Sequence, residues 1–188
     1  MKKKEWVNLP NALTSVRILL APALLLVFFR VSGEERRLTV SLCLFLAAGV
    51  TDCLDGFAAR KLHQITRLGK VLDPIADKLF MASVLLCLTC AQVIPWPVLA
   101  LIVLKELYMA AGAAACLKNH IEVASDIYGK AATALFYPAV LLAWPWHGVR
   151  ALSLTGRGLI FLSVALSILA AVHYTLDSVK KWRERQAR

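Results

Sequence analysis

The chain has 188 residues, of which 59% are hydrophobic and only 18% are charged. Soluble domains contain roughly 45–50% apolar residues, so this composition excludes a disordered chain and is too apolar for a water-exposed globule. The formal net charge is +10, which in a soluble protein would suggest a nucleic-acid partner. In a membrane protein the same excess is typical of cytoplasmic loops beside anionic lipid. We therefore expect membrane lipids, and no nucleic acid, as partners.

A helix needs about 20 mostly apolar residues to cross a bilayer. Six segments approach that length, at residues 12–29, 38–59, 74–92, 97–117, 131–145 and 153–176. The first follows a basic start, as in a signal peptide, but its apolar run begins late, so we interpret it as a retained helix. The fifth is short, and Tyr128 to Lys130 extend it. With no internal repeat or linker, residues 1–188 are predicted to form one domain, an all-α integral membrane bundle of six transmembrane helices.

Loop charge predicts the orientation of this bundle. Most basic loop residues lie before the first helix, after the second and fourth helices, and in the C-terminal tail. Cytoplasmic loops of membrane proteins carry an excess of lysine and arginine. Both termini are therefore predicted to lie in the cytoplasm, in a multi-pass protein of the cell membrane.

Four of the six aspartates lie between residues 52 and 77, at the predicted cytoplasmic ends of the second and third helices. Asp52 and Asp55 are three residues apart and Asp73 and Asp77 are four apart, so each pair shares a helix face. Carboxylates gathered in a low dielectric repel one another unless a cation neutralises them. Oxygen ligands without thiols or paired histidines favour Mg²⁺ or Mn²⁺ over zinc. These residues predict a divalent-metal site open to the cytoplasm.

The residues between the two pairs suit a phosphate ligand. Gly56 and Gly69 lack side chains, which allows the backbone to approach a ligand or a neighbouring helix. Ala59 keeps the same face small, and Arg60 supplies a fixed positive charge for phosphate.

Each aspartate pair also has a purely structural interpretation. Asp73 can cap a helix with Pro74 at its first position, and Asp52 and Asp55 can pair with Arg60 or Lys61. Intramembrane carboxylates are functional by default, however, so the two pairs together favour a functional site.

In order, these residues read Asp52-x2-Asp55-Gly56-x2-Ala59-Arg60-x8-Gly69-x3-Asp73-x3-Asp77. The pattern resembles, at every position, the signature of the CDP-alcohol phosphotransferases, and the six-helix layout fits that family. The resemblance implies metal-dependent transfer of a substituted phosphate from a CDP-linked donor to an alcohol, with release of CMP. It implies that Asp52, Asp55 and Asp73 hold one or two ions and that Asp77 is the general base and a further candidate ligand. The implied nucleotide site consists of Asp52, Gly56, Ala59, Arg60 and Gly69.

Other segments concern the acceptor alcohol. The stretch from Asn8 to Arg17 resembles the opening of bacterial phosphatidylglycerophosphate synthases and of the cardiolipin synthases that use CDP-diacylglycerol. Lys105-Glu106 lies where the former have Arg-Glu, and Gly129-Lys130 matches their Gly-Lys. This resemblance implies a homodimer that uses CDP-diacylglycerol and glycerol 3-phosphate, with Arg17, Lys105 and Lys130 binding the acceptor phosphate. Structural alternatives are that Arg17 snorkels and that Glu106 neutralises Lys105.

Two further functions stay open at this point. Phosphatidylglycerol could be the acceptor, as in cardiolipin synthases, because the fourth helix lacks a second arginine and has small residues at 110–115. A divalent-cation transporter would also need clustered carboxylates, but it would need ionisable groups through the whole bilayer. Here the acids lie at one end, which favours the transferase.

Overall fold

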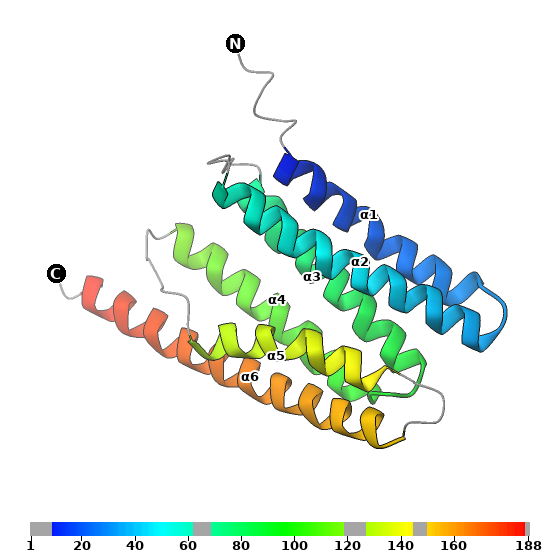
Figure 1. Cartoon of the computed structure of the whole chain (residues 1–188). Helices are drawn as coiled ribbons and strands as arrows, with labels where there is room; N and C mark the ends of the chain where they lie inside the picture. Colours follow the sequence, from blue (N-terminus) through cyan, green and yellow to red (C-terminus); the bar gives the residue numbers. More distant parts are fainter. Residues whose placement is uncertain (1–8, 62–68, 119–126, 145–149, 187–188) are drawn as a thin grey trace, which may run out of the picture. The chain divides into compact units, whose positions relative to one another are not determined.

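The computed structural model describes residues 9–61, 69–118, 127–144 and 150–186, with the side chains at 9–11, 53, 55–61, 69–71, 117–118, 150 and 185–186 excepted. Every regular element in these ranges is a helix (Figure 1). The helices are α1 (Leu9–Arg30), α2 (Glu34–Lys61), α3 (Gly69–Cys90), α4 (Trp96–Lys118), α5 (Ile127–Ala143) and α6 (Arg150–Gln186). The predicted helices correspond to these six in order, and α5 includes the predicted extension through Tyr128 to Lys130.

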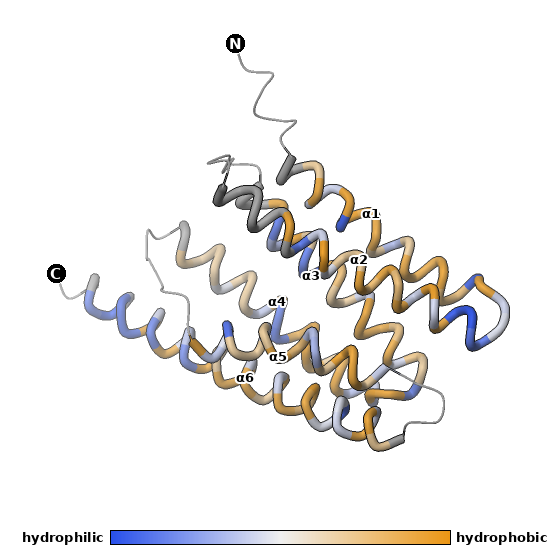
Figure 2. The backbone as a smooth tube through the Cα atoms, viewed as in Figure 1, coloured by the Kyte–Doolittle hydropathy of each residue, from blue (hydrophilic) through white to orange (hydrophobic). Residues whose placement is uncertain are grey.

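Three of the described helices are long and apolar enough to cross a membrane, over Ala12–Arg30, Trp96–Cys116 and Ala151–Glu184. Large apolar side chains on them are open to the surroundings, with Leu19 68% and Leu104 65% exposed. Apolar residues line most of the helices, whereas hydrophilic residues collect at the α1–α2 turn and the C-terminal part of α6 (Figure 2). The prediction of an all-helical membrane protein is confirmed. Six crossings and cytoplasmic termini stay predictions.

The chain divides into two compact units, Met1–Ala91 with α1 to α3 and Gln92–Arg188 with α4 to α6. Each unit is described by itself. In the first unit α1 packs against both α2 and α3. Ala21, Leu24 and Phe28 recur at helical spacing on α1 and are buried, while Phe45 of α2 stacks on Phe80 of α3 with ring centroids 6.4 Å apart. These contacts hold α2 and α3 in place beside α1.

Helix α2 begins at Glu34, four residues before the predicted start. Gly33 has a φ of 87°, which glycine adopts without steric cost and which ends the connection from α1. Glu34 and Glu35 then occupy the first turn, where negative charge is favourable to the helix dipole. These local signals lie outside the apolar run, so hydrophobicity alone did not predict this start.

Helix α3 begins at Gly69, and Pro74 lies inside it. The interpretation of Asp73 as a helix cap with Pro74 at the first position is therefore wrong. A proline near a helix start removes one backbone hydrogen bond, and membrane helices tolerate it when neighbouring groups compensate. The earlier start places Asp73 and Asp77 on a formed helix, both within its first nine residues.

In the second unit α6 packs along α5 and also contacts α4. Gly156 of α6 lies against the α5 backbone so closely that an added Cβ would be 2.0 Å from the nitrogen of Ala143. Ser163 also donates a hydrogen bond of 2.8 Å to the carbonyl of Ala132. Close approach at a small residue is typical of membrane helix pairs. Helix α6 continues to Gln186, and its charged end carries a Lys181–Asp177 ion pair of 3.0 Å.

Candidate active site

One face of α1 carries two buried polar side chains. Thr14 is 0% exposed and Arg17 is 1% exposed, and their spacing of three places them on the same side of the helix. Burying a charged side chain is unfavourable unless it is paired and hydrogen-bonded. The partners of this face therefore indicate why it is polar.

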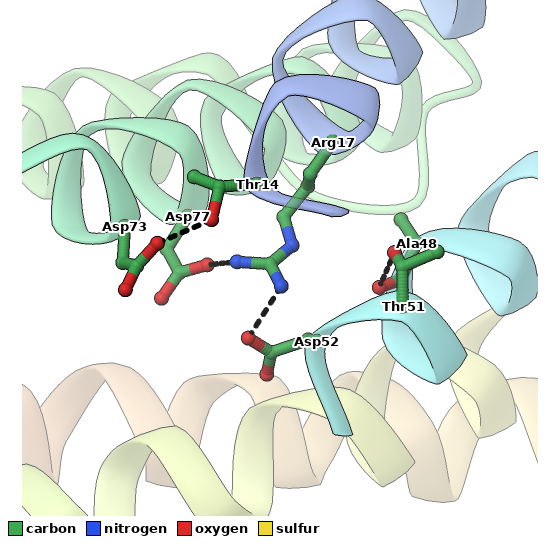
Figure 3. Close-up of polar contacts among 7 residues, drawn as sticks. All are labelled: Thr14, Arg17, Ala48, Thr51, Asp52, Asp73 and Asp77. Carbon is green, nitrogen blue, oxygen red and sulfur yellow. Dashed lines mark hydrogen bonds and ion pairs between the residues drawn. The ribbon is translucent and has the colours of Figure 1, made fainter. Parts of the chain in front are cut away.

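Those partners are aspartates of the predicted cluster (Figure 3). The Nη2 atom of Arg17 lies 2.8 Å from Oδ1 of Asp52 on α2, and its Nη1 donates a hydrogen bond to Oδ1 of Asp77 on α3. The Thr14 hydroxyl donates a hydrogen bond to Oδ1 of Asp73. Three of the four predicted aspartates, from two helices, thus meet α1 at one place.

The carboxylates are more accessible than the groups that bind them. Asp52 is 37% exposed and Asp77 is 46% exposed, whereas the Arg17 side chain between them is 1% exposed. The guanidinium therefore lies deeper in the protein than the two carboxylates, each of which keeps an exposed side. Each contact uses Oδ1, so the contact itself leaves Oδ2 for another ligand.

The predicted nucleotide residues lie on the adjoining parts of the same two helices. Gly56, Ala59 and Arg60 belong to the last turns of α2, and Gly69 is the first residue of α3. The side-chain contacts of these positions, and those of Asp55, lie outside the described residues. Their nucleotide and metal roles stay predictions.

The candidate acceptor residues do not all share this environment. Arg17 contacts aspartates and is buried, so the interpretation that it snorkels to the surface is wrong. Lys105 pairs with Glu106, as the structural alternative proposed, with the two side chains 16% and 28% exposed. Lys130 is exposed in the first turns of α5. Both lysines belong to the second unit, and their role in acceptor binding stays a prediction.

Residues 7–173 match the sequence model of the family described as CDP-alcohol phosphatidyltransferase. The chain belongs to this family. The match includes α1, all eight signature residues and most of α6.

Similar proteins include bacterial and plant transferases that align with this chain along most of their length. A CDP-diacylglycerol–glycerol-3-phosphate 3-phosphatidyltransferase of Aquifex aeolicus is 34% identical over 179 residues, which cover 93% of this chain and 97% of the relative. Proteins of the same name from Rickettsia felis and Arabidopsis thaliana are 30% and 33% identical, covering 89% and 94% of this chain and 93% and 81% of the relatives. The resemblance stated from the signature residues is therefore confirmed.

The donor atoms of this CDP-alcohol phosphatidyltransferase site suit a hard cation. The contacting groups are carboxylates, the ligands that Mg²⁺ and Mn²⁺ prefer. Within the described part of the chain, no group of three or more histidine, cysteine, aspartate or glutamate residues is arranged to hold a metal ion. Asp55, the predicted fourth carboxylate, has its side chain outside that part. The chemistry of the donors fits the predicted metal.

Sequence reasoning assigned no role to Thr14. Its signal was present, because Thr14 precedes Arg17 by three residues in the segment that resembles the phosphatidylglycerophosphate synthases. A hydroxyl and a guanidinium on one face of an apolar helix indicate a shared polar partner. The partner itself lies 59 residues later, at Asp73.

Proposed function

We propose that this chain transfers the phosphatidyl group of CDP-diacylglycerol to glycerol 3-phosphate, which gives phosphatidylglycerophosphate and CMP. The observation that carries the proposal is the meeting of Asp52, Asp73 and Asp77 at one face of α1 in a member of this family. The relatives named above carry the corresponding activity in their names and align along most of their length.

In this reaction a hydroxyl oxygen of the acceptor attacks the phosphorus that carries the diacylglycerol. A new phosphorus–oxygen bond forms, the bond to the CMP oxygen breaks, and CMP leaves. A carboxylate must accept the hydroxyl proton, and we assign this role to Asp77. Its partly exposed carboxylate is oriented by Arg17, which leaves the acceptor an accessible oxygen.

Phosphoryl transfer depends mainly on positioning and on neutralisation of negative charge. We propose Mg²⁺, or Mn²⁺, as the cofactor, held by Asp52, Asp55 and Asp73 with Asp77 as a further candidate ligand. When bound, the ion neutralises the diphosphate of the donor. Arg60, with Gly56, Ala59 and Gly69, is proposed to bind the cytidine nucleotide, and Lys105 and Lys130 the acceptor phosphate.

The membrane setting completes the proposal. The basic C-terminal part of α6 favours a cytoplasmic location near anionic lipid. We propose that both termini and the aspartate site face the cytoplasm of the cell membrane, and that the enzyme is a homodimer, as the family resemblance implies. Because the chain belongs to a family of transferases, we do not propose the transporter alternative.

The direct test is an assay of purified protein in lipid nanodiscs with Mg²⁺ and CDP-diacylglycerol. Glycerol 3-phosphate and phosphatidylglycerol are supplied in separate reactions, and CMP and lipid products are identified by mass spectrometry. We expect phosphatidylglycerophosphate from the first reaction and loss of CMP release in Asp77→Asn. Asp177→Asn, the same change on α6, is the matched control and retains activity. Cardiolipin from the second reaction alone would correct the acceptor, and no CMP in either would refute the proposal.

A further inference from the structure

Arg17 is a single cation that joins carboxylates of two different helices. Its two terminal nitrogens contact Asp52 on α2 and Asp77 on α3, and its side chain is 1% exposed. The contacts span 35 and 60 positions of sequence. An arginine so placed does not act as a surface charge, because solvent screens it little.

We propose that Arg17 is a positioning residue, which serves as the resident counter-cation of the aspartates and fixes the separation and direction of Asp52 and Asp77. The inference rests on the proposed function, since these are the carboxylates assigned to the metal and to the proton. It differs from the expectation that Arg17 binds the acceptor phosphate.

The geometry of the contacts favours positioning over phosphate binding. Both Nη atoms of Arg17 already contact carboxylates and its side chain is 1% exposed, so little of the guanidinium is accessible to an acceptor phosphate. Without a bound cation, a further anion beside Asp52 and Asp77 would also be repelled by them. Thr14 acts in the same way toward Asp73, although without charge.

The planar guanidinium explains why arginine fits this position. Its nitrogens form a rigid fork that reaches two carboxylates in fixed directions, whereas a lysine ammonium is a compact point charge on a flexible stem. Lysine would supply the charge without fixing the geometry. Charge and positioning therefore predict different behaviour for Arg17→Lys and Arg17→Gln.

The counter-cation role predicts a specific link to metal. Removing one partner of a buried ion pair is strongly destabilising because it leaves uncompensated charge. Without Arg17, a bound divalent ion would supply positive charge that Asp52 and Asp77 have lost. A ligand that binds the folded state stabilises it, so Mg²⁺ should stabilise Arg17→Gln more than it stabilises the wild type.

The experiment measures thermal unfolding in nanodiscs with EDTA and with Mg²⁺, together with kcat and KM for glycerol 3-phosphate. Arg17→Gln and Arg17→Lys are compared with Arg36→Gln, which removes an exposed cation of α2. In EDTA we expect a lower unfolding midpoint for Arg17→Gln, and a larger upward shift on adding Mg²⁺. We expect kcat to fall by about 100-fold, as for a misplaced catalytic group, and KM to stay within about threefold. Arg17→Lys should restore the unfolding midpoint in EDTA more fully than it restores kcat.

Several outcomes decide against the inference. A rise in KM of about tenfold or more, with kcat and the EDTA midpoint unchanged, would assign Arg17 to the acceptor phosphate. The inference would also be overturned if the wild type is active and Arg17→Gln has the same unfolding midpoints and kcat as Arg36→Gln. If the wild type releases no CMP but Arg17→Gln still lowers the EDTA midpoint, the proposed function fails while the counter-cation role stands. If Arg17→Gln folds only with Mg²⁺, the inference is supported, and kcat and KM are then measured on Arg17→Lys.

Discussion

Thr14 of α1 donates a hydrogen bond to Asp73 of α3, although the two residues lie 59 positions apart in the sequence. The Thr14 side chain is fully buried, so its hydroxyl has exchanged water for this carboxylate. A buried hydrogen bond to a charged group contributes about 1.5–3 kcal/mol. Thr14 therefore belongs to the candidate active site and not only to the packing of α1.

The Thr14→Val variant tests this contact, because valine keeps the shape of threonine and removes the donor. We expect the free energy of unfolding to fall by about 1–3 kcal/mol and the rate of CMP release to fall by about tenfold or more. Thr14→Ser keeps a hydroxyl and should retain more of both properties. Unfolding midpoints and CMP assays in nanodiscs provide the measurements. Equal rates for Thr14→Val and the wild type would show that the hydrogen bond from Thr14 to Asp73 does not contribute to turnover.

Metal removal tests the chemistry of the aspartates as a group. With EDTA we expect CMP release to fall to background, because the carboxylates and the donor diphosphate are all anionic and repel one another. Addition of Mg²⁺ or Mn²⁺ should restore the activity, since both prefer oxygen ligands. CMP release is followed as either ion is titrated into the chelated enzyme. Undiminished turnover in excess EDTA would exclude the proposed cofactor.

The close contact of α5 and α6 predicts a sharp difference between two neighbouring glycines. A Cβ at Gly156 would collide with the backbone of Ala143, whereas nothing lies within 4 Å of a Cβ at Gly158. We expect Gly156→Ala to destabilise the protein by about 1–3 kcal/mol, as overpacking does. Gly158→Ala should instead be neutral or stabilise by up to about 1 kcal/mol, because alanine favours a helix. Thermal unfolding of the two variants measures the difference, and equal midpoints would contradict the α5–α6 packing.

The orientation of the chain predicts where a protease reaches α6. Lys180, Lys181 and Arg183 lie in its hydrophilic C-terminal part, beyond the apolar stretch (Figure 2). Trypsin should cleave there in inside-out membrane vesicles and not in intact cells, because these residues are proposed to face the cytoplasm. The fragments are identified by mass spectrometry. Cleavage in intact cells alone would reverse the proposed orientation.

Much of the fold and part of the site were predictable from local features of the sequence. The six apolar segments predicted six helices, because apolar length is a property of a continuous segment. The spacing of Asp73 and Asp77 predicted a shared helix face for the same reason. The start of α3 was missed because Pro74 suggested a helix start, whereas the packed helix tolerates it in its second turn.

The partners of the aspartates were not predictable in this way. Arg17 was expected to bind a phosphate of the acceptor or to snorkel, and either role suits an arginine near a helix end. The observed contacts depend on how α1 packs against α2 and α3, which no local pattern of residues specifies. Burial excludes the snorkelling role, since an arginine that is 1% exposed must find its partners inside the protein, and the acceptor-phosphate role stays a prediction.

The burial of Arg17 also bears on the order in which this protein is assembled. Helix α1 is synthesised before either of the carboxylates that neutralise its arginine. An unpaired arginine within a membrane helix is costly, up to about 2.5–3.5 kcal/mol at the helix centre on insertion scales. The early chain therefore holds α1 in an unfavourable state, which ends only when α2 and α3 pack against it. Assembly of this protein therefore requires that α1 remains able to pack against α2 and α3 until both have been synthesised.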